Sequence, residues 1–119
     1  MIQIKRIYLP AEDSDGYRVL VDRLWPRGIK KTEAQLDDWF KELGPSTVLR
    51  KWFDHQVDRW PEFRKRYADE LLASASRELI NDLRERSRNQ IVTLTYAARN
   101  ELQNNAVVIR DFIRDSPHR

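Results

Sequence analysis

The stretch YRVLVDRLWPRGIKK, residues 17–31, joins a run of apolar residues to a cluster of cations. Its first part, residues 17–24, is almost continuously apolar, which is typical of a strand covered on both faces. We therefore expect a central strand that ends near Asp22 and Arg23. Beyond it, Trp25 and Pro26 stand among Arg27, Lys30 and Lys31, so a basic and aromatic corner follows the strand directly.

Two further segments have the character of strands. Residues 2–8, IQIKRIY, alternate apolar and polar positions, and residues 90–98, QIVTLTYAA, are rich in β-branched residues. Residues 9–16 between the first two strands form a polar, turn-rich loop. A helical crossover usually needs about a dozen residues, so the sequence leaves open whether these strands are parallel or antiparallel.

Helices are expected between and after the strands. Residues 32–45 show the clearest pattern, with a capping box of Thr32 and Gln35 and one apolar face of Leu36, Trp39, Phe40 and Leu43. A short helix over 45–53 should turn Val48, Leu49, Trp52 and Phe53 inward. A long helix should begin at Pro61, loosen at 73–76 and continue from a Ser76 cap, and a last helix should cover 104–115. Together these elements predict one small α/β domain over residues 1–119, with a central sheet flanked by helices.

Composition excludes several classes of protein. The chain of 119 residues is 40% hydrophobic and 34% charged, with a net charge of +3 and no cysteine. Disulfides and thiolate chemistry are thereby excluded, and the only histidines, His55 and His118, share no metal-binding spacing. The start lacks a signal peptide and no apolar run could cross a membrane. We expect a cytoplasmic protein without membrane contact, metal or cofactor.

The basic corner is a candidate binding site. In parallel α/β sheets, ligands bind beyond the carboxyl ends of the strands. Arg23 and Arg27 could clamp a phosphate or carboxylate, Lys30 could add charge, and Trp25 could stack on a base or sugar. A structural interpretation is equally open: Trp25 would close the end of the core, Arg23 would pair with Asp22 or Asp38, and the lysines would be solvated.

The segment after the last strand supplies the opposite side of this candidate site. Tyr96, Asn104 and Asn105 bring a hydroxyl and two amides to a junction between strand and helix, where they could orient a ligand. Asn104 or Asn100 is also expected to cap the last helix, and the two roles are compatible.

Two other functions stay open from the residues alone. His55 or Tyr96 could carry a proton in an enzyme acting on a nucleotide or glycosidic bond, provided that His55 comes within reach of the basic corner. Nucleic-acid binding would need a continuous positive stripe from the corner to Arg64 and Lys65. Ligand identity and oligomeric state are not determined by the sequence.

The blocks DGYRVLVDRLWPRGIKK, PSTVLRKWF, FRKRYADEL and VTLTYAARN, followed by QNNAVV, resemble the YeaO-like family of bacterial domains of unknown function. The resemblance runs from Lys5 to Ile113. It implies a central, largely parallel sheet, and it implies that the segment from Arg23 to Gly28 acts as one unit.

The resemblance also marks a departure. In more distant relatives the segment after the last strand resembles an acidic residue followed by Cys-His-Arg, whereas this chain has Asn104-Asn105-Ala106 near that place. Without a thiol or an imidazole, this part of the site lacks a nucleophile and a general base. The resemblance therefore implies a shared binding site more than a shared reaction, and our first hypothesis is a domain that binds a small anionic or nucleotide-like ligand.

Overall fold

The computed structural model describes residues 1–115, and His118 and the tail 116–119, which we expected to fray, lie outside them. Four parallel strands form one sheet in the order β1-β4-β2-β3. They are β1 (Ile2–Arg6), β2 (Tyr17–Leu20), β3 (Asp38–Trp39) and β4 (Val92–Tyr96). The expected α/β architecture with a central sheet is confirmed, and the sheet is parallel throughout.

The order of strands answers the question left open by the short loop after β1. β1 and β2 do not pair with each other, because β4 lies between them. Leu94 of β4 is opposite Ile4 on one side and Val19 on the other. The carboxyl ends of β1, β2 and β4 therefore meet at one end of the sheet, as the candidate site requires.

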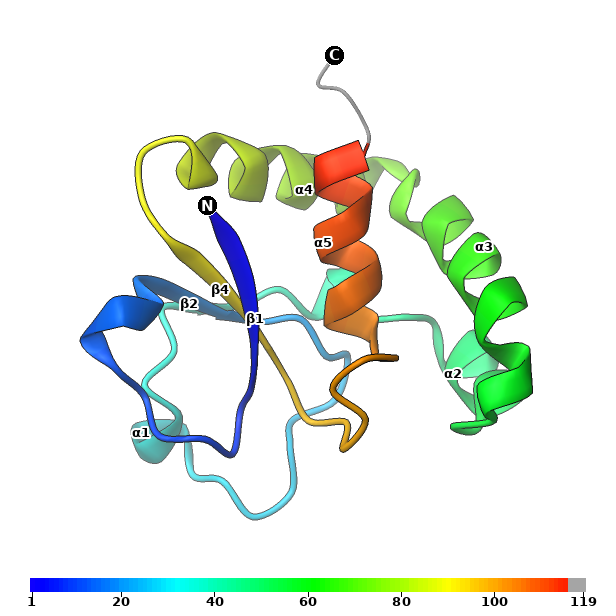
Figure 1. The fold of residues 1–119 in the computed structure, drawn as a ribbon, viewed down its shortest axis with the longest axis horizontal. Coiled ribbons are helices and arrows are strands. Elements are labelled where there is room, and N and C mark those ends of the chain that lie inside the picture. The colour runs from blue at the N-terminus through cyan, green and yellow to red at the C-terminus, as the bar shows by residue number, and fades with distance from the viewer. Residues whose placement is uncertain (116–119) are drawn as a thin grey trace.

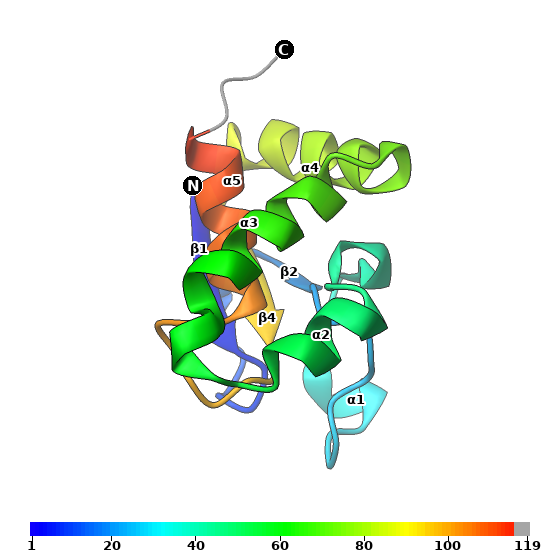
Figure 2. The same ribbon diagram turned by 90° about the vertical axis from the view of Figure 1, so that its right-hand side faces the viewer.

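Helices flank this sheet (Figure 1). They are α1 (Lys31–Ala34), α2 (Thr47–Phe53), α3 (Trp60–Leu71), α4 (Ser74–Ser87) and α5 (Asn105–Asp115), with single turns of 3-10 helix at η1 (Asp13–Asp15), η2 (Lys41–Leu43) and η3 (Val57–Arg59). α5 packs on β1 and β4, and α3 packs against α2, α4 and α5. Figure 2 shows the second view, in which α3 crosses α5 and α2 lies below α3.

The core lies between the sheet and the helices. Val19, Leu94 and Ile109 are completely buried, which fits the continuous apolar character of β2 and β4. A cluster of stacked aromatic rings, formed by Phe53, Trp60 and Phe63, joins α2 to α3. Among residues 1–115, no helix combines the length and the apolar composition needed to span a membrane.

The helix predicted over residues 32–45 is wrong. Only the single turn α1 and the 3-10 turn η2 form there, and the chain leaves α1 at Gln35 with a left-handed φ of 49°. Asp37 then donates its backbone N–H to the carbonyl of Arg18 and accepts the Arg18 N–H on its carboxylate. The segment therefore extends the sheet as β3 beside β2, because pairing with an existing strand outweighs the helical spacing of its apolar residues.

Two details of the other helices also differ from expectation. Val48 is exposed, whereas Leu49 and Phe53 of the same helix are buried as predicted. α4 begins at Ser74, so Ser76 does not cap it; its hydroxyl instead donates to the carbonyl of Glu42. The expected break between α3 and α4 is present at residues 72–73.

Candidate functional site

A partly buried carboxylate organises the end of the sheet. Asp22, just beyond β2, accepts a hydrogen bond from the Ala97 backbone N–H at 3.0 Å and another from Asn105 Nδ2 at 2.8 Å. Ala97 follows β4 and Asn105 is the first residue of α5. One side chain thus connects the ends of two strands with the start of a helix.

The environment of Asp22 disfavours its charge. Desolvation raises the pKa of this carboxyl above its ordinary value, and the hydrogen bonds from Asn105 and Ala97, together with the charge of Arg50, only partly offset that effect. Burial first, and then the charges of Asp22 and Glu70, raise the pKa of the fully buried Tyr67, whose hydroxyl donates to the carbonyl of Leu43.

Arg23 is held by two consecutive backbone carbonyls. Its Nε donates to Pro45 O at 3.0 Å and its Nη2 donates to Gly44 O at 2.7 Å. Both hydrogens lie on the same edge of the planar guanidinium, so the side chain is fixed in direction. Nη1 makes no hydrogen bond within residues 1–115. The alternative in which Arg23 pairs with Asp22 or Asp38 is wrong.

A cavity of about 290 Å³ lies beside this arginine. It is bounded by the segment after β2, the loop before α2, and the facing parts of α3 and α4. Its lining residues are Arg23, Glu42, Gly44, Ser46, Tyr67, Glu70, Leu71, Ala73 and Ser76. A fixed guanidinium on the wall of a hollow is the arrangement expected of an anion site, although Glu42 and Glu70 add negative charge to the same wall.

The carboxylate of Glu70 is already engaged. It accepts the backbone N–H of Ser46 at 2.8 Å and the Ser46 hydroxyl at 2.5 Å. Ser46 Oγ in turn accepts the Leu49 N–H and caps α2. Both carboxylate oxygens of Glu70 are thus held by Ser46, although the carboxylate keeps its negative charge.

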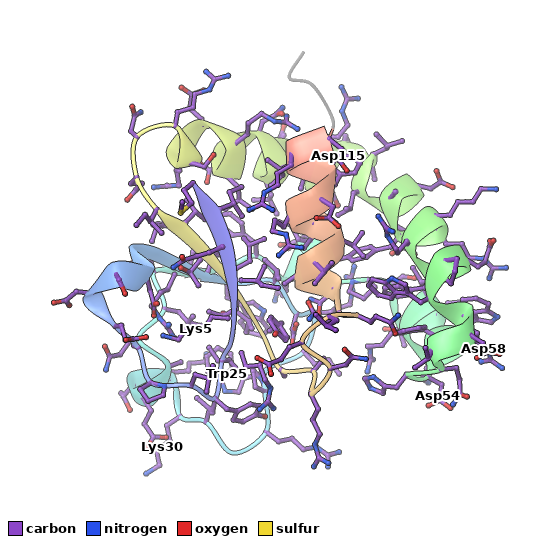
Figure 3. The ribbon with its side chains drawn as sticks, viewed as in Figure 1. Lys5, Trp25, Lys30, Asp54, Asp58 and Asp115 are labelled. Atoms are coloured by element: carbon purple, nitrogen blue, oxygen red, sulfur yellow. The ribbon has the colours of Figure 1, made fainter. Side chains whose placement is uncertain are left out.

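The other members of the basic corner lie elsewhere. Trp25 donates from Nε1 to Ile29 O, makes an edge contact with the ring of Trp39 and has the Lys31 ammonium 5.8 Å from its ring centroid. Arg27 and Lys30 are exposed. Figure 3 shows Lys30 at the edge of the molecule beyond Trp25. Trp25, Arg27 and Lys30 do not line the cavity of Arg23.

The residues after β4 form a small network of their own. Asn104 is buried, accepts the Val107 N–H on Oδ1 and donates from Nδ2 to Asn100 O, so it caps α5 as predicted. The buried Tyr96 hydroxyl has a raised pKa, caused first by desolvation and then by Glu101, while Arg6 and a hydrogen bond with Asn104 lower it. Asn105 reaches Asp22, which adjoins Arg23, but Tyr96 and Asn104 do not line the cavity.

His55 lies far from the basic corner. It is exposed, follows α2 with a left-handed φ of 54°, and contacts the ring of Phe53. In Figure 3 its neighbour Asp54 lies across the molecule from Lys30. The structure therefore does not bring His55 within reach of that corner.

Arg64 and Lys65 line a different hollow, a groove of about 600 Å³ between α3 and α5. Asp111 and Asp115 line its other wall, and Arg64 Nη2 lies 3.9 Å from Asp111 Oδ2. Acidic groups thus accompany these cations, and the arrangement is not the stripe that nucleic-acid binding requires.

Sequence reasoning missed the residues that surround Arg23. Gly44, Ser46, Tyr67 and Glu70 come from segments that only the tertiary fold brings together, so no local pattern marks them. Asp22 did carry a signal, because it is a charged residue at the end of an otherwise apolar strand.

The fold and this site define a small α/β domain with a parallel sheet and a polar cluster at the carboxyl ends of its strands. A family model described as the inactive DUF488-N3 subclade matches residues 1–119. The chain belongs to the DUF488 family, which confirms the resemblance to YeaO-like proteins stated from the sequence.

Its relatives match over nearly their whole length. The chain is 50% identical over 113 residues to the uncharacterized protein YeaO of Escherichia coli, covering 95% of this chain and 96% of that one. It is 37% identical over 112 residues to the uncharacterized protein Rv3073c of Mycobacterium tuberculosis, covering 94% and 92%. No solved structure matches the chain.

Proposed function

We propose that the chain binds a small anionic ligand without chemical turnover, and that Arg23 holds the anionic group. The observation that carries the proposal is the guanidinium of Arg23 on the wall of a cavity, tethered by Gly44 and Pro45 on one edge only. Its free Nη1 hydrogens can donate to a carboxylate or phosphate oxygen.

Fixing the arginine beforehand favours binding. A long arginine side chain loses rotamer freedom when it grips a ligand, at a cost of about 0.5–1.5 kcal/mol. The two carbonyl hydrogen bonds have already restricted Arg23, so much of that cost falls on folding and not on binding. The hydrogen bonds from Ser46 to Glu70 are consistent with the same proposal, because they hold both oxygens of that carboxylate at Ser46 and not at Arg23.

Binding without turnover is supported by two considerations. The matching family model is described as an inactive subclade. Neither proton carrier considered from the sequence, His55 or Tyr96, lines the cavity of Arg23, and Asp54, the neighbour of His55, lies across the molecule from Lys30 in Figure 3. A small anion is favoured over a nucleotide because Trp25, the ring expected to stack on a base, does not line the cavity of Arg23.

Calorimetric titration with inorganic phosphate, citrate and AMP at constant ionic strength tests the proposal. We expect at least one small anion to bind the native chain, with affinity lost in Arg23→Gln and kept in Lys51→Gln, a control on the exposed surface of α2. An Arg27→Gln variant locates the site. If Arg27→Gln abolished binding and Arg23→Gln did not, the anion would bind at the exposed corner, which would contradict binding in the cavity of Arg23. Absence of binding by all three anions would contradict the proposal itself.

A further inference from the structure

The carboxyl end of the sheet exposes large apolar side chains to solvent. Tyr8 and Leu9 follow β1, Leu24 follows β2, and Leu102 follows β4, with exposed fractions of 43%, 44%, 58% and 82%. They are half of the exposed large apolar residues in the described part of the chain. Removing such side chains from water stabilises a complex, so apolar side chains gathered at one end of the molecule indicate an interaction surface.

Hydrogen bonds join the three loops that carry these side chains. Tyr8 donates its hydroxyl to Arg27 O at 2.8 Å, which links the loop after β1 to the loop after β2. The Arg6 guanidinium lies over the Tyr8 ring and donates to Ala97 O and Ala98 O, which links both to the loop after β4. In Figures 1 and 2 these segments all lie toward the lower end of the molecule, with the loop after β1 between the other two in Figure 2.

Cations are interleaved with the apolar residues on the same loops. Arg27, Lys30 and Arg99 are exposed, and none of them forms an ion pair within residues 1–115. Together with Tyr8, Leu9, Leu24 and Leu102 they form what we call the carboxyl-end surface. Unpaired cations beside exposed leucines suit a partner that is both acidic and apolar.

We propose that the carboxyl-end surface docks a segment of another protein that carries acidic and large apolar side chains. A second copy of this chain fits less well, because its own surface carries basic and acidic side chains side by side and offers no acidic face to Arg27, Lys30 and Arg99. Nucleic acid fits less well too, since three of the four apolar side chains are leucines, which do not stack on bases.

An anionic bilayer is disfavoured by the acidic residues on these loops. Glu101 directly precedes Leu102, and Glu12 and Asp13 are exposed on the loop after Leu9. Inserting Leu102 into a bilayer would carry the Glu101 carboxylate toward anionic headgroups. A peptide can instead place single acidic side chains opposite Arg27, Lys30 and Arg99 while leaving Glu101 in solvent.

Selection of short random peptides against the full chain tests the proposal without assuming a sequence. We expect the selected peptides to be enriched in acidic and large apolar residues, and to shift backbone amide NMR signals of residues 7–10, 24–30 and 99–103. Leu24→Ser, Leu102→Ser and Arg27→Glu should each weaken binding roughly tenfold. Val57→Ser and Lys51→Glu, which change exposed residues elsewhere, should leave binding unchanged.

Three outcomes would overturn the proposal: failure to select any peptide, selected peptides that lack acidic residues, or signals that shift in the α3–α5 groove. Cosedimentation of the chain with vesicles of phosphatidylcholine and phosphatidylserine tests the membrane alternative. Binding of the chain to these vesicles, without binding of any peptide, would also overturn the proposal. Phosphate titration at Arg23 is an independent measurement, so failure at either site leaves the other proposal standing.

Discussion

Asn105 donates from Nδ2 to the Asp22 carboxylate over 2.8 Å, and this contact joins residues 83 positions apart in the chain. The same amide also donates to the carbonyl of Val21 at 3.0 Å. The first residue of α5 is therefore fastened to the end of β2. This contact positions the segment that carries Arg23.

Replacing Asn105 with alanine tests that role. Loss of the amide removes two hydrogen bonds from a partly buried site, so we expect the free energy of unfolding to fall by about 1–3 kcal/mol in urea denaturation. The pKa of Asp22 should rise further, because one of the hydrogen bonds that lower it is removed. An unchanged Asp22 titration, followed by side-chain carboxyl NMR, would contradict this account, and Asn89→Ala in the exposed turn after α4 is the matched control.

Asp22 itself gives stability a dependence on pH. Its pKa is raised in the folded chain, so folding favours the protonated form. Below the unfolded pKa of about 3.9 the group is neutral in both states, and its unfavourable contribution develops as pH rises through the folded pKa. An Asp22→Asn variant should therefore lose less stability than the native chain as pH rises over that interval, as measured by urea denaturation at a series of pH values.

Asp15 should act in the opposite direction. Burial tends to raise its pKa, but hydrogen bonds from the Glu12 N–H, Lys5 and Arg18 outweigh burial and hold the pKa below the ordinary value. Its stabilisation is present above the unfolded pKa of about 3.9 and is lost as pH falls through the folded value. Asp15→Asn should cost about 3 kcal/mol at pH 7 and reduce the acid sensitivity of unfolding. Asp13→Asn, at an exposed neighbour, should change neither quantity.

Gly44 is required because the backbone of Arg23 lies against it. A Cβ at Gly44 would come within 2.3 Å of Arg23 N, although the φ of −67° suits any residue. Gly28 is the converse case. Its φ is 79°, which favours glycine, but a Cβ added there would meet no atom within 4 Å. Gly44→Ala should cost about 3 kcal/mol and Gly28→Ala about 1 kcal/mol in thermal unfolding. Equal costs would show that the contact with Arg23 is unimportant.

The strands and the carboxyl-end location of polar residues could be predicted from the sequence because they depend on local patterns. The continuous apolar run at β2 and the β-branched run at β4 each require burial on two faces. The region from Lys31 to Leu43 could not be predicted, because its apolar spacing fits a helix while its backbone pairs with Arg18. The contacts of Arg23 with Gly44 and Pro45 depend on the path of the same misassigned region, so they could not be predicted from the sequence either.

The arginine side-chain NMR signal of Arg23 tests the central claim most directly. In a chain labelled with ¹⁵N arginine, the Nε–H signal of Arg23, assigned from its loss in Arg23→Lys, should be protected by its hydrogen bond to Pro45 O. On titration with the small anion that binds in calorimetry, we expect this signal to shift with the same dissociation constant. Movement of the Arg27 signal alone, with Arg23 unchanged at saturation, would contradict the account.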